Sequence, residues 1–160
     1  MADHERQSAI DRIERTFEQI HRERMVGLPI LNPHLAVRLV GPRAWQGGWL
    51  GVLVTPWTMN LIALPGAGSA ESPGAPGSTR ERVLPSGHYE FIAGADPRLG
   101  PYETCSLFSP MDAFADQETA LAAAAAILGL LFDPPPAAPA PRGLSRRGLL
   151  RAALGGGAGA

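Results

Sequence analysis

The sequence predicts an α+β fold: a mostly antiparallel β-sheet with an N-terminal and a C-terminal helix packed on it. Three observations support this fold class. A helical apolar pattern opens the chain, a run of short strand patterns follows, and an alanine-rich helical pattern comes last. This order differs from the strand–helix alternation of parallel sheets. We expect one domain over residues 8–133, followed by a Pro-rich linker and a flexible basic tail over residues 134–160.

The first helix is predicted over about Ser8–Met25. Its apolar residues recur at spacings of three and four, which places them on one helix face: Ile10, Ile13, Phe17 and Ile20. Ser8, with Asp11 three residues later, is the expected N-terminal cap. Gly27 and Pro29 are expected to end the helix.

The second helix is predicted from Asp112 or Asp116 to Leu131. Its body is rich in alanine, which has the highest intrinsic helix propensity, and larger apolar side chains are interspersed in it. Asp133 and the three prolines after it are expected to end this helix.

Between the helices, short apolar or alternating segments are separated by Gly and Pro, which is typical of strands. We predict strands over Leu35–Val40, Trp45–Val54, Met59–Leu64, Arg82–Leu84, Gly87–Ala93 and Thr104–Phe108. Gly41-Pro42-Arg43 is expected to end the first strand, and Gly47-Gly48 to form a turn or bulge in the second. A hairpin turn is expected at Pro85-Ser86-Gly87, and a surface loop over Gly66–Thr79.

Composition and charge argue against several classes of protein. A net charge of −1 provides no basic field for nucleic acid. The single cysteine, Cys105, and four scattered histidines predict no disulfide, metal or cofactor. No carboxylate pair stands in a recognisable arrangement, so we expect no enzyme activity. Cys105 is expected to be a small buried strand residue, and the alternative is a nucleophile served by His88.

The chain is expected to be cytoplasmic and to have no membrane span. Its first residues are polar and charged and lack the apolar region of a secretory signal. The longest uncharged helical run, Thr119–Phe132, is shorter than the roughly 20 residues that cross a bilayer.

All three tryptophans fall in one short stretch, at Trp45, Trp49 and Trp57. Trp49 is expected in the core of the sheet. Trp57 follows Pro56, which cannot donate to a sheet ladder and therefore bends the chain or places it at an edge. Trp57 is expected either in the core or at a rim, where an amphipathic ring anchors an apolar peptide.

The predicted tail contains Ser145-Arg146-Arg147-Gly148-Leu149-Leu150-Arg151. This pattern is similar to a twin-arginine export signal, although such signals act at an N-terminus. The alternative is a disordered basic tail.

Several segments occur in the order found in one known family: Thr16–Met25 with Leu31-Asn32-Pro33, Gly48–Trp57, Leu64-Pro65-Gly66, Leu84-Pro85-Ser86-Gly87 and Cys105–Pro110. Together they resemble the HybE family of [NiFe]-hydrogenase assembly chaperones, also called HupJ in some systems, over about residues 10–152. The Gly/Pro-rich loop after Leu64 and the Pro-rich linker depart from that family. The cysteine pairs of the rubredoxin-like extension in some relatives are missing.

The resemblance implies a maturation chaperone that binds hydrogenase precursors, namely the twin-arginine signal of the small subunit, the large subunit, or both. It implies that export is delayed until cofactor insertion is complete. Such a signal fits a hydrophobic trough with carboxylates at one end. The implied client-binding residues are Met25, Thr55, Pro56, Trp57 and Met59 for the trough, and Glu14, Glu18 and Glu103 for the arginines.

We also hypothesise that the tail, through Arg146, Arg147, Leu149 and Leu150, mimics the client signal and occupies the same trough. Three other interpretations remain open: a chaperone that contacts only the large subunit, a Cys105-dependent redox or hydrolytic protein, and a structural subunit of a hydrogenase complex.

Overall fold

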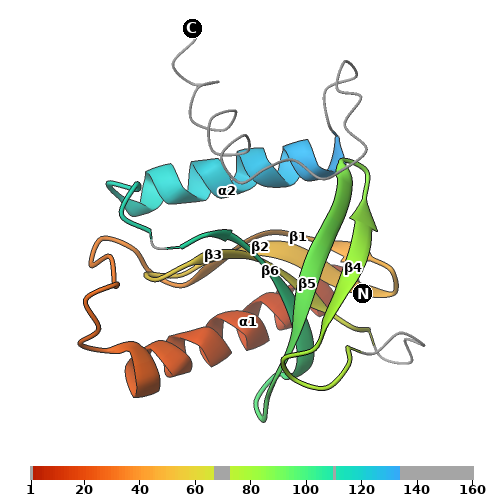
Figure 1. The fold of residues 1–160 in the computed structure, drawn as a ribbon, viewed down its shortest axis with the longest axis horizontal. Helices are drawn as coiled ribbons and strands as arrows, with labels where there is room; N and C mark the ends of the chain where they lie inside the picture. Colours follow the sequence, from red (N-terminus) through yellow and green to blue (C-terminus); the bar gives the residue numbers. More distant parts are fainter. Residues whose placement is uncertain (1, 67–72, 110, 134–160) are drawn as a thin grey trace, which may run out of the picture.

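A computed structural model describes residues 2–66, 73–109 and 111–133 of the chain. These residues form a six-stranded sheet in the order β1-β2-β3-β6-β5-β4, with every pair of neighbours antiparallel. The N-terminal helix packs on one face of the sheet, and the C-terminal helix packs on the other (Figure 1). The predicted fold class is therefore confirmed. The predicted linker and tail lie outside the described residues.

The first helix starts earlier than predicted. Helix α1 spans Ala2–Ile20 and continues into a wider π-helical turn, η1, over His21–Met25. Ser8 is exposed inside α1 and is not its cap. Asp3 and Glu5 lie in the first turn, where negative charge interacts favourably with the helix dipole. The predicted apolar face is confirmed where Ile13 and Phe17 are buried.

The first two strands form a hairpin, β1 (Arg38–Trp45) and β2 (Gly48–Val54). The prediction that Gly41-Pro42-Arg43 ends the first strand was wrong, because β1 continues through these residues as a bulge between Val40 and Arg43. β1 is an edge strand, and Pro is tolerated at an edge or a bulge. Gln46 and Gly47 have φ values of 49° and 80°, as a two-residue type I′ turn requires.

The remaining strands are β3 (Met59–Leu64), β4 (Thr79–Leu84), β5 (Gly87–Asp96) and β6 (Gly100–Phe108). The strand predicted at Met59–Leu64 and the hairpin turn at Pro85-Ser86-Gly87 are confirmed. β4 and β6 begin earlier than predicted, because their first residues are polar or turn-forming and carry little apolar signal.

The second helix, α2, spans Gln117–Phe132. The later of the two predicted starts is confirmed, since the Asp116 side chain accepts a hydrogen bond from the Thr119 backbone N–H at 2.8 Å. This is the geometry of an N-cap. Small alanines on one side let α2 lie close to the sheet: Ala120, Ala123 and Ala124 are all buried.

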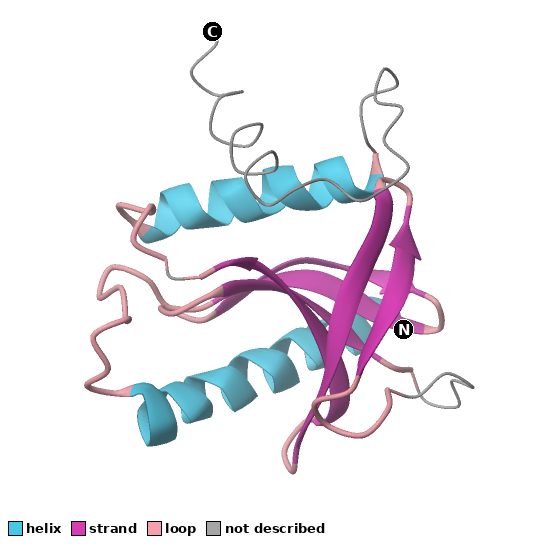
Figure 2. Cartoon of the chain, in the orientation of Figure 1, coloured by secondary structure: helices cyan, strands magenta, loops and turns pink. Residues whose placement is uncertain are grey.

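Each face of the sheet carries its own apolar cluster, because side chains alternate along a strand. The cluster under α2 includes Leu50, Val52, Met59, Phe91 and Ile127. The cluster under α1 includes Ile13, Phe17, Leu39, Leu53 and Ile62. The result is a three-layer arrangement with the sheet in the middle (Figure 2). No helix among the described residues is long and apolar enough to cross a membrane.

Candidate binding surface

The β2–β3 turn, which contains Thr55, Pro56 and Trp57, is held by an internal network. Thr55 is fully buried; its hydroxyl accepts from the Thr58 N–H at 2.9 Å and donates to the Thr58 carbonyl at 2.9 Å. Pro56 is buried, and its carbonyl accepts from the Asn32 N–H at 2.8 Å. Thr55 and Pro56 therefore fix the shape of the turn and offer little surface to a partner.

Trp57 is half-buried and takes part in both the core and the surface. Its ring packs against the cluster under α1. The His21 ring lies with its centroid 5.7 Å from that of Trp57. Met25, which is also half-buried, is the last residue of η1 and lies one turn after His21. The structure thus brings Trp57 and Met25 to the same end of the molecule, where α1 ends and the β2–β3 turn begins.

The segment that follows η1 exposes three large apolar side chains that our sequence interpretation missed. Val26 is 67% exposed, Leu28 42% and Ile30 46%. Only two other large apolar side chains are exposed among the described residues. We call residues Val26–Leu31 the apolar loop. Concentrated exposed apolar surface of this kind marks interaction sites. The alternation of Val, Leu and Ile with Gly27 and Pro29 is a usable signal, but the same glycine and proline also indicate the end of a helix.

Two anchors hold the apolar loop in place. Asn32 follows the loop, and its side-chain amide donates to the carbonyls of Met111 and Phe114 at 3.0 and 2.8 Å. Before the loop, Glu23 of η1 pairs with Arg98 in the β5–β6 turn at 3.2 Å. The loop is therefore fixed at both ends to other parts of the fold, and its apolar side chains are presented on a defined backbone.

The Arg98 anchor is itself tied to a buried carboxylate. Asp96 accepts from the Arg98 side chain at 2.9 Å and from the Arg98 N–H at 2.9 Å. These hydrogen bonds to Arg98 hold the pKa of Asp96 below its ordinary value. The pKa of Glu23 is lowered as well, first by the hydrogen bond from Gln19 and then by the charge of Arg98. The cluster carries one positive charge between two negative ones.

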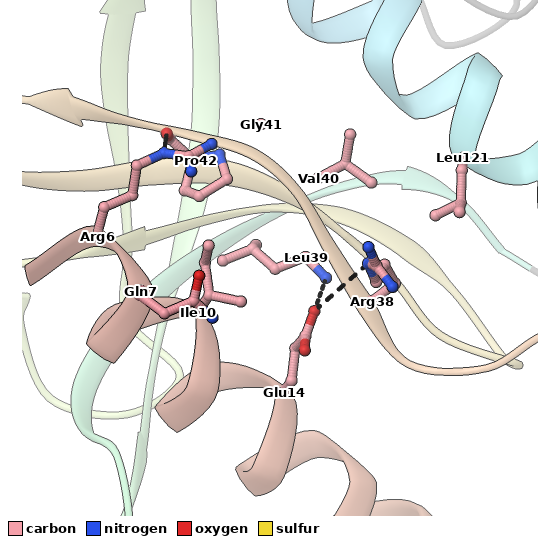
Figure 3. A pocket seen from close by; sticks show the side chains of 10 residues that line it. All are labelled: Arg6, Gln7, Ile10, Glu14, Arg38, Leu39, Val40, Gly41, Pro42 and Leu121. Atoms are coloured by element: carbon pink, nitrogen blue, oxygen red, sulfur yellow. Dashed lines mark hydrogen bonds and ion pairs between the residues drawn. The ribbon is translucent and has the colours of Figure 1, made fainter. Parts of the chain in front are cut away.

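Glu14 and Glu18 lie on the side of α1 that faces β1, but they differ in accessibility. Glu14 accepts from the Leu39 N–H at 2.9 Å and approaches Arg38 at 3.9 Å, so it closes the free edge of β1 (Figure 3). Glu18 is more exposed and pairs loosely with Arg22 at 3.8 Å. Glu18 and His21 are three residues apart, a spacing that makes helix side chains neighbours. Glu18 is thus the accessible carboxylate of the two.

An open groove of about 560 Å³ runs between α1 and the edge strand β1 (Figure 3). Arg6 and Arg38 line it together with Glu14. Arg6 donates to the Pro42 carbonyl at 3.0 Å. Two guanidinium groups against one carboxylate make this groove a poor receptor for an arginine-rich ligand, so it is not the trough expected from the sequence.

Met59 and Glu103 are not brought to this surface. Met59 is fully buried in the cluster under α2. Glu103 is buried in β6, where it pairs with Ala63 near the other end of β3. Its carboxylate accepts from Arg80 at 2.6 and 2.7 Å and also from Arg82. Neither side chain is accessible to a partner in this structure.

The structure does not place Cys105 and His88 together as a nucleophile and its base. Cys105 is half-buried in β6 and packs against the cluster under α2. His88 is exposed and pairs with Glu81 at 2.8 Å. Within the described ranges, no group of three His, Cys, Asp or Glu side chains is arranged to hold a metal ion. The tail residues Arg146, Arg147, Leu149 and Leu150 lie outside the described residues.

Residues 8–152 match the family model for "[NiFe]-hydrogenase assembly, chaperone, HybE". The class of protein is therefore an assembly chaperone for hydrogenases. The chain belongs to the HybE family, as the resemblance of its motifs had indicated.

The relatives support this assignment over most of the chain. A hydrogenase expression/formation protein HoxT from Azotobacter vinelandii is 50% identical over 83% of this chain and 88% of its own length. A hydrogenase expression/formation protein HupJ from Bradyrhizobium diazoefficiens is 37% identical over 87% and 85%. The solution structure of HybE from Escherichia coli superposes with a TM-score of 0.63 at 24% identity, covering 82% of this chain and 83% of that one. That likeness bears on the fold.

Proposed function

We propose that this chain binds precursor subunits of a [NiFe]-hydrogenase in the cytoplasm and delays export until cofactor insertion is complete. The client segment is the twin-arginine signal of the small-subunit precursor. The observation that carries this proposal is the apolar loop, a fixed row of exposed Val, Leu and Ile beside Trp57 and Met25. The chaperone acts by binding and catalyses no reaction of its own.

The chemistry of the surface fits the chemistry of such a signal. The apolar stretch of the signal packs on Val26, Leu28 and Ile30, where burial of apolar area supplies about 25 cal/mol per Å². Met25 adds an adaptable thioether side chain that fits varied apolar partners. Glu18, the more accessible carboxylate on the side of α1 that faces β1, meets a signal arginine through a charge-assisted hydrogen bond.

A co-purification experiment tests which precursor is bound. The tagged chain is expressed with the small-subunit precursor, with that precursor lacking its signal, and with the large-subunit precursor, each separately. We expect the full small-subunit precursor to be retained and the signal-less form to be lost. Retention of the large-subunit precursor alone would contradict the signal-binding role and support a chaperone of the large subunit.

The delay of export is tested in cells that lack this chain. We expect the small subunit to reach the periplasm without its partner and with reduced hydrogenase activity. Reintroducing the wild-type chain restores coupled export. The variant Leu28→Ser, which alters only an exposed side chain, restores it less well. Normal coupling in the absence of the chain would overturn this part of the proposal.

A further inference from the structure

A second exposed surface lies on the outer face of the β4–β5 hairpin. It carries the two other exposed large apolar side chains, Val83 at 57% and Ile92 at 46%. Exposed residues alternate with buried or partly buried ones along both strands, and the exposed ones face each other in three pairs. We call these six residues the hairpin outer face: Thr79 opposite Ile92, Glu81 opposite Glu90, and Val83 opposite His88.

Helix α1 packs on the same side of the sheet but does not cover this hairpin. Ile92 lies opposite Thr104, which lies opposite Ile62 of the cluster under α1, so these three residues share a face. That cluster contains no described residue of β4 or β5. The hairpin outer face is thus the uncovered part of a sheet face whose other part is packed.

The charges on the hairpin outer face are of one sign and lie directly opposite each other. Glu81 and Glu90 are cross-strand partners, an arrangement that destabilises a sheet when it is not compensated. His88 pairs with Glu81 at 2.8 Å. Within the part of the chain that the structure describes, Glu90 has no ion-pair partner. Two carboxylates flanked by Val83 and Ile92 fit a segment in which arginines stand next to large apolar side chains.

The chain leaves the described fold at the turn end of this hairpin, where α2 packs on the opposite face of the sheet. The last turn of α2 is tied to the hairpin turn, since the Ser86 N–H donates to the Leu131 carbonyl at 3.1 Å. Figure 1 shows the C-terminal end of α2 beside the start of β5. About 13 residues separate Asp133 from Arg146, and an extended chain of that length spans up to about 45 Å. The strand from Ser86 back to Glu81 measures only about 17 Å.

We propose that the C-terminal segment Ser145–Arg151 docks on the hairpin outer face of its own molecule. Arg146 and Arg147 meet Glu81 and Glu90, and Leu149 and Leu150 pack on Val83 and Ile92. The partner of this surface is therefore the basic, leucine-containing end of the same chain.

This placement differs from the trough that we expected for the tail from the sequence. The apolar loop lies at the other end of α2, where the Gln117 side chain hydrogen-bonds to the Ala36 backbone at 2.9 and 3.2 Å. A helix of the length of α2 separates these two ends by about 24 Å. Exposed ion pairs are weak, but a short tether holds a segment at roughly millimolar effective concentration. The surface nearest the exit point is therefore favoured.

Amide NMR spectra of the full chain test the proposal from both sides. In Arg146→Ser/Arg147→Ser we expect the signals of Glu81, Val83, Glu90 and Ile92 to move, while those of the apolar loop stay in place. In Glu81→Gln/Glu90→Gln we expect the signals of Leu149 and Leu150 to move. The matched control Glu5→Gln/Glu118→Gln, which removes two exposed carboxylates elsewhere, leaves the tail signals unchanged. The wild-type docking signature weakens in about 1 M salt, where the Debye length is about 3 Å.

Three outcomes would overturn the proposal. Hairpin signals that coincide between the wild type and Arg146→Ser/Arg147→Ser show that the tail does not dock there. Shifts confined to residues 26–31 place the tail in the client surface. Differences that vanish on tenfold dilution show that the contact forms between molecules and not within one.

Discussion

At the scale of single residues, exposure decides which side chains a partner can reach and which ones contribute only to the fold. Met59 and Leu28 are apolar residues of similar size, but Met59 is fully buried and Leu28 is 42% exposed. Trp57 lies between these extremes, since its ring packs on the core and on His21. A substitution therefore tests a binding role only where the side chain is accessible.

Met59→Ala is expected to reduce stability by about 2–5 kcal/mol, because it leaves a cavity among fully buried neighbours. Leu28→Ser is expected to change stability by less than about 0.5 kcal/mol, as exposed substitutions do. Urea unfolding monitored by circular dichroism measures both. A loss above 2 kcal/mol for Leu28→Ser would show that the apolar loop belongs to the core.

Glu103→Gln is expected to destabilise the chain by about 3 kcal/mol, because it leaves two partly buried arginines without their shared counter-charge. The control is Glu118→Gln, an exposed change on α2. Client affinity is expected to be unchanged in both variants, measured on the folded protein. Selective loss of affinity in Glu103→Gln with full stability would return Glu103 to the binding site.

At the scale of elements, polar side chains fix the start of α2, the free edge of β1 and the position of η1. Asp116 caps α2 through the Thr119 N–H, and Glu14 and Arg6 occupy the free backbone edge of β1. The Glu23–Arg98–Asp96 cluster links η1 to the β5–β6 turn. These contacts join parts of the chain that are far apart in sequence, and they determine where the apolar loop is presented.

Asp116→Ala is expected to cost about 1 kcal/mol, the typical value of an N-cap. Asp116→Asn, which keeps the acceptor oxygen, is expected to lose only a few tenths of that amount. Thermal unfolding of the two variants in parallel gives the comparison. Equal melting temperatures for Asp116→Ala and the wild type would contradict the capping role.

Acid is expected to loosen η1 through Asp96. Its pKa is lowered in the folded chain by the hydrogen bond from Arg98. A lowered folded pKa stabilises the fold above the unfolded value of 3.8, and that stability is lost as the pH falls through the folded pKa. In Asp96→Asn this part of the pH dependence between about pH 5 and pH 2 disappears. Identical acid profiles for variant and wild type would contradict it.

Local pattern predicted the elements well where it was strong. The apolar stripe of α1, the strand Met59–Leu64 and the hairpin at Pro85-Ser86-Gly87 were predicted correctly because spacing and turn residues act locally. The bulge in β1 was missed because Pro42 is acceptable only at an edge, and edges depend on the whole sheet.

The candidate site was predictable only in part. Trp57 and Met25 lie at the same end of the molecule. Whether a predicted site residue is accessible depends on its burial, and burial is set by long-range packing. No local sequence pattern around Met59 or Glu103 reveals that these side chains are buried. Val26, Leu28 and Ile30 were missed because a helix stop and a binding loop have the same Gly and Pro signals.

At the scale of the whole molecule, α2 has two different surfaces near its ends. The apolar loop lies near its start, and the chain leaves the described fold beside the β4–β5 turn at its end. The rigid sheet between the two helices keeps these surfaces apart. In our proposals, a client signal and the C-terminal segment of the chain have separate binding surfaces, and we expect that occupation of one does not block the other.

The most direct test of this account compares client affinity after equivalent changes to the two exposed apolar surfaces. A peptide with the small-subunit signal is titrated calorimetrically into the wild type, into Val26→Ser/Leu28→Ser/Ile30→Ser and into Val83→Ser/Ile92→Ser. We predict that the first variant raises Kd at least about tenfold, since each tenfold step corresponds to about 1.4 kcal/mol. We predict that the second variant leaves Kd unchanged. Equal affinity of the apolar-loop variant and the wild type would contradict the central claim.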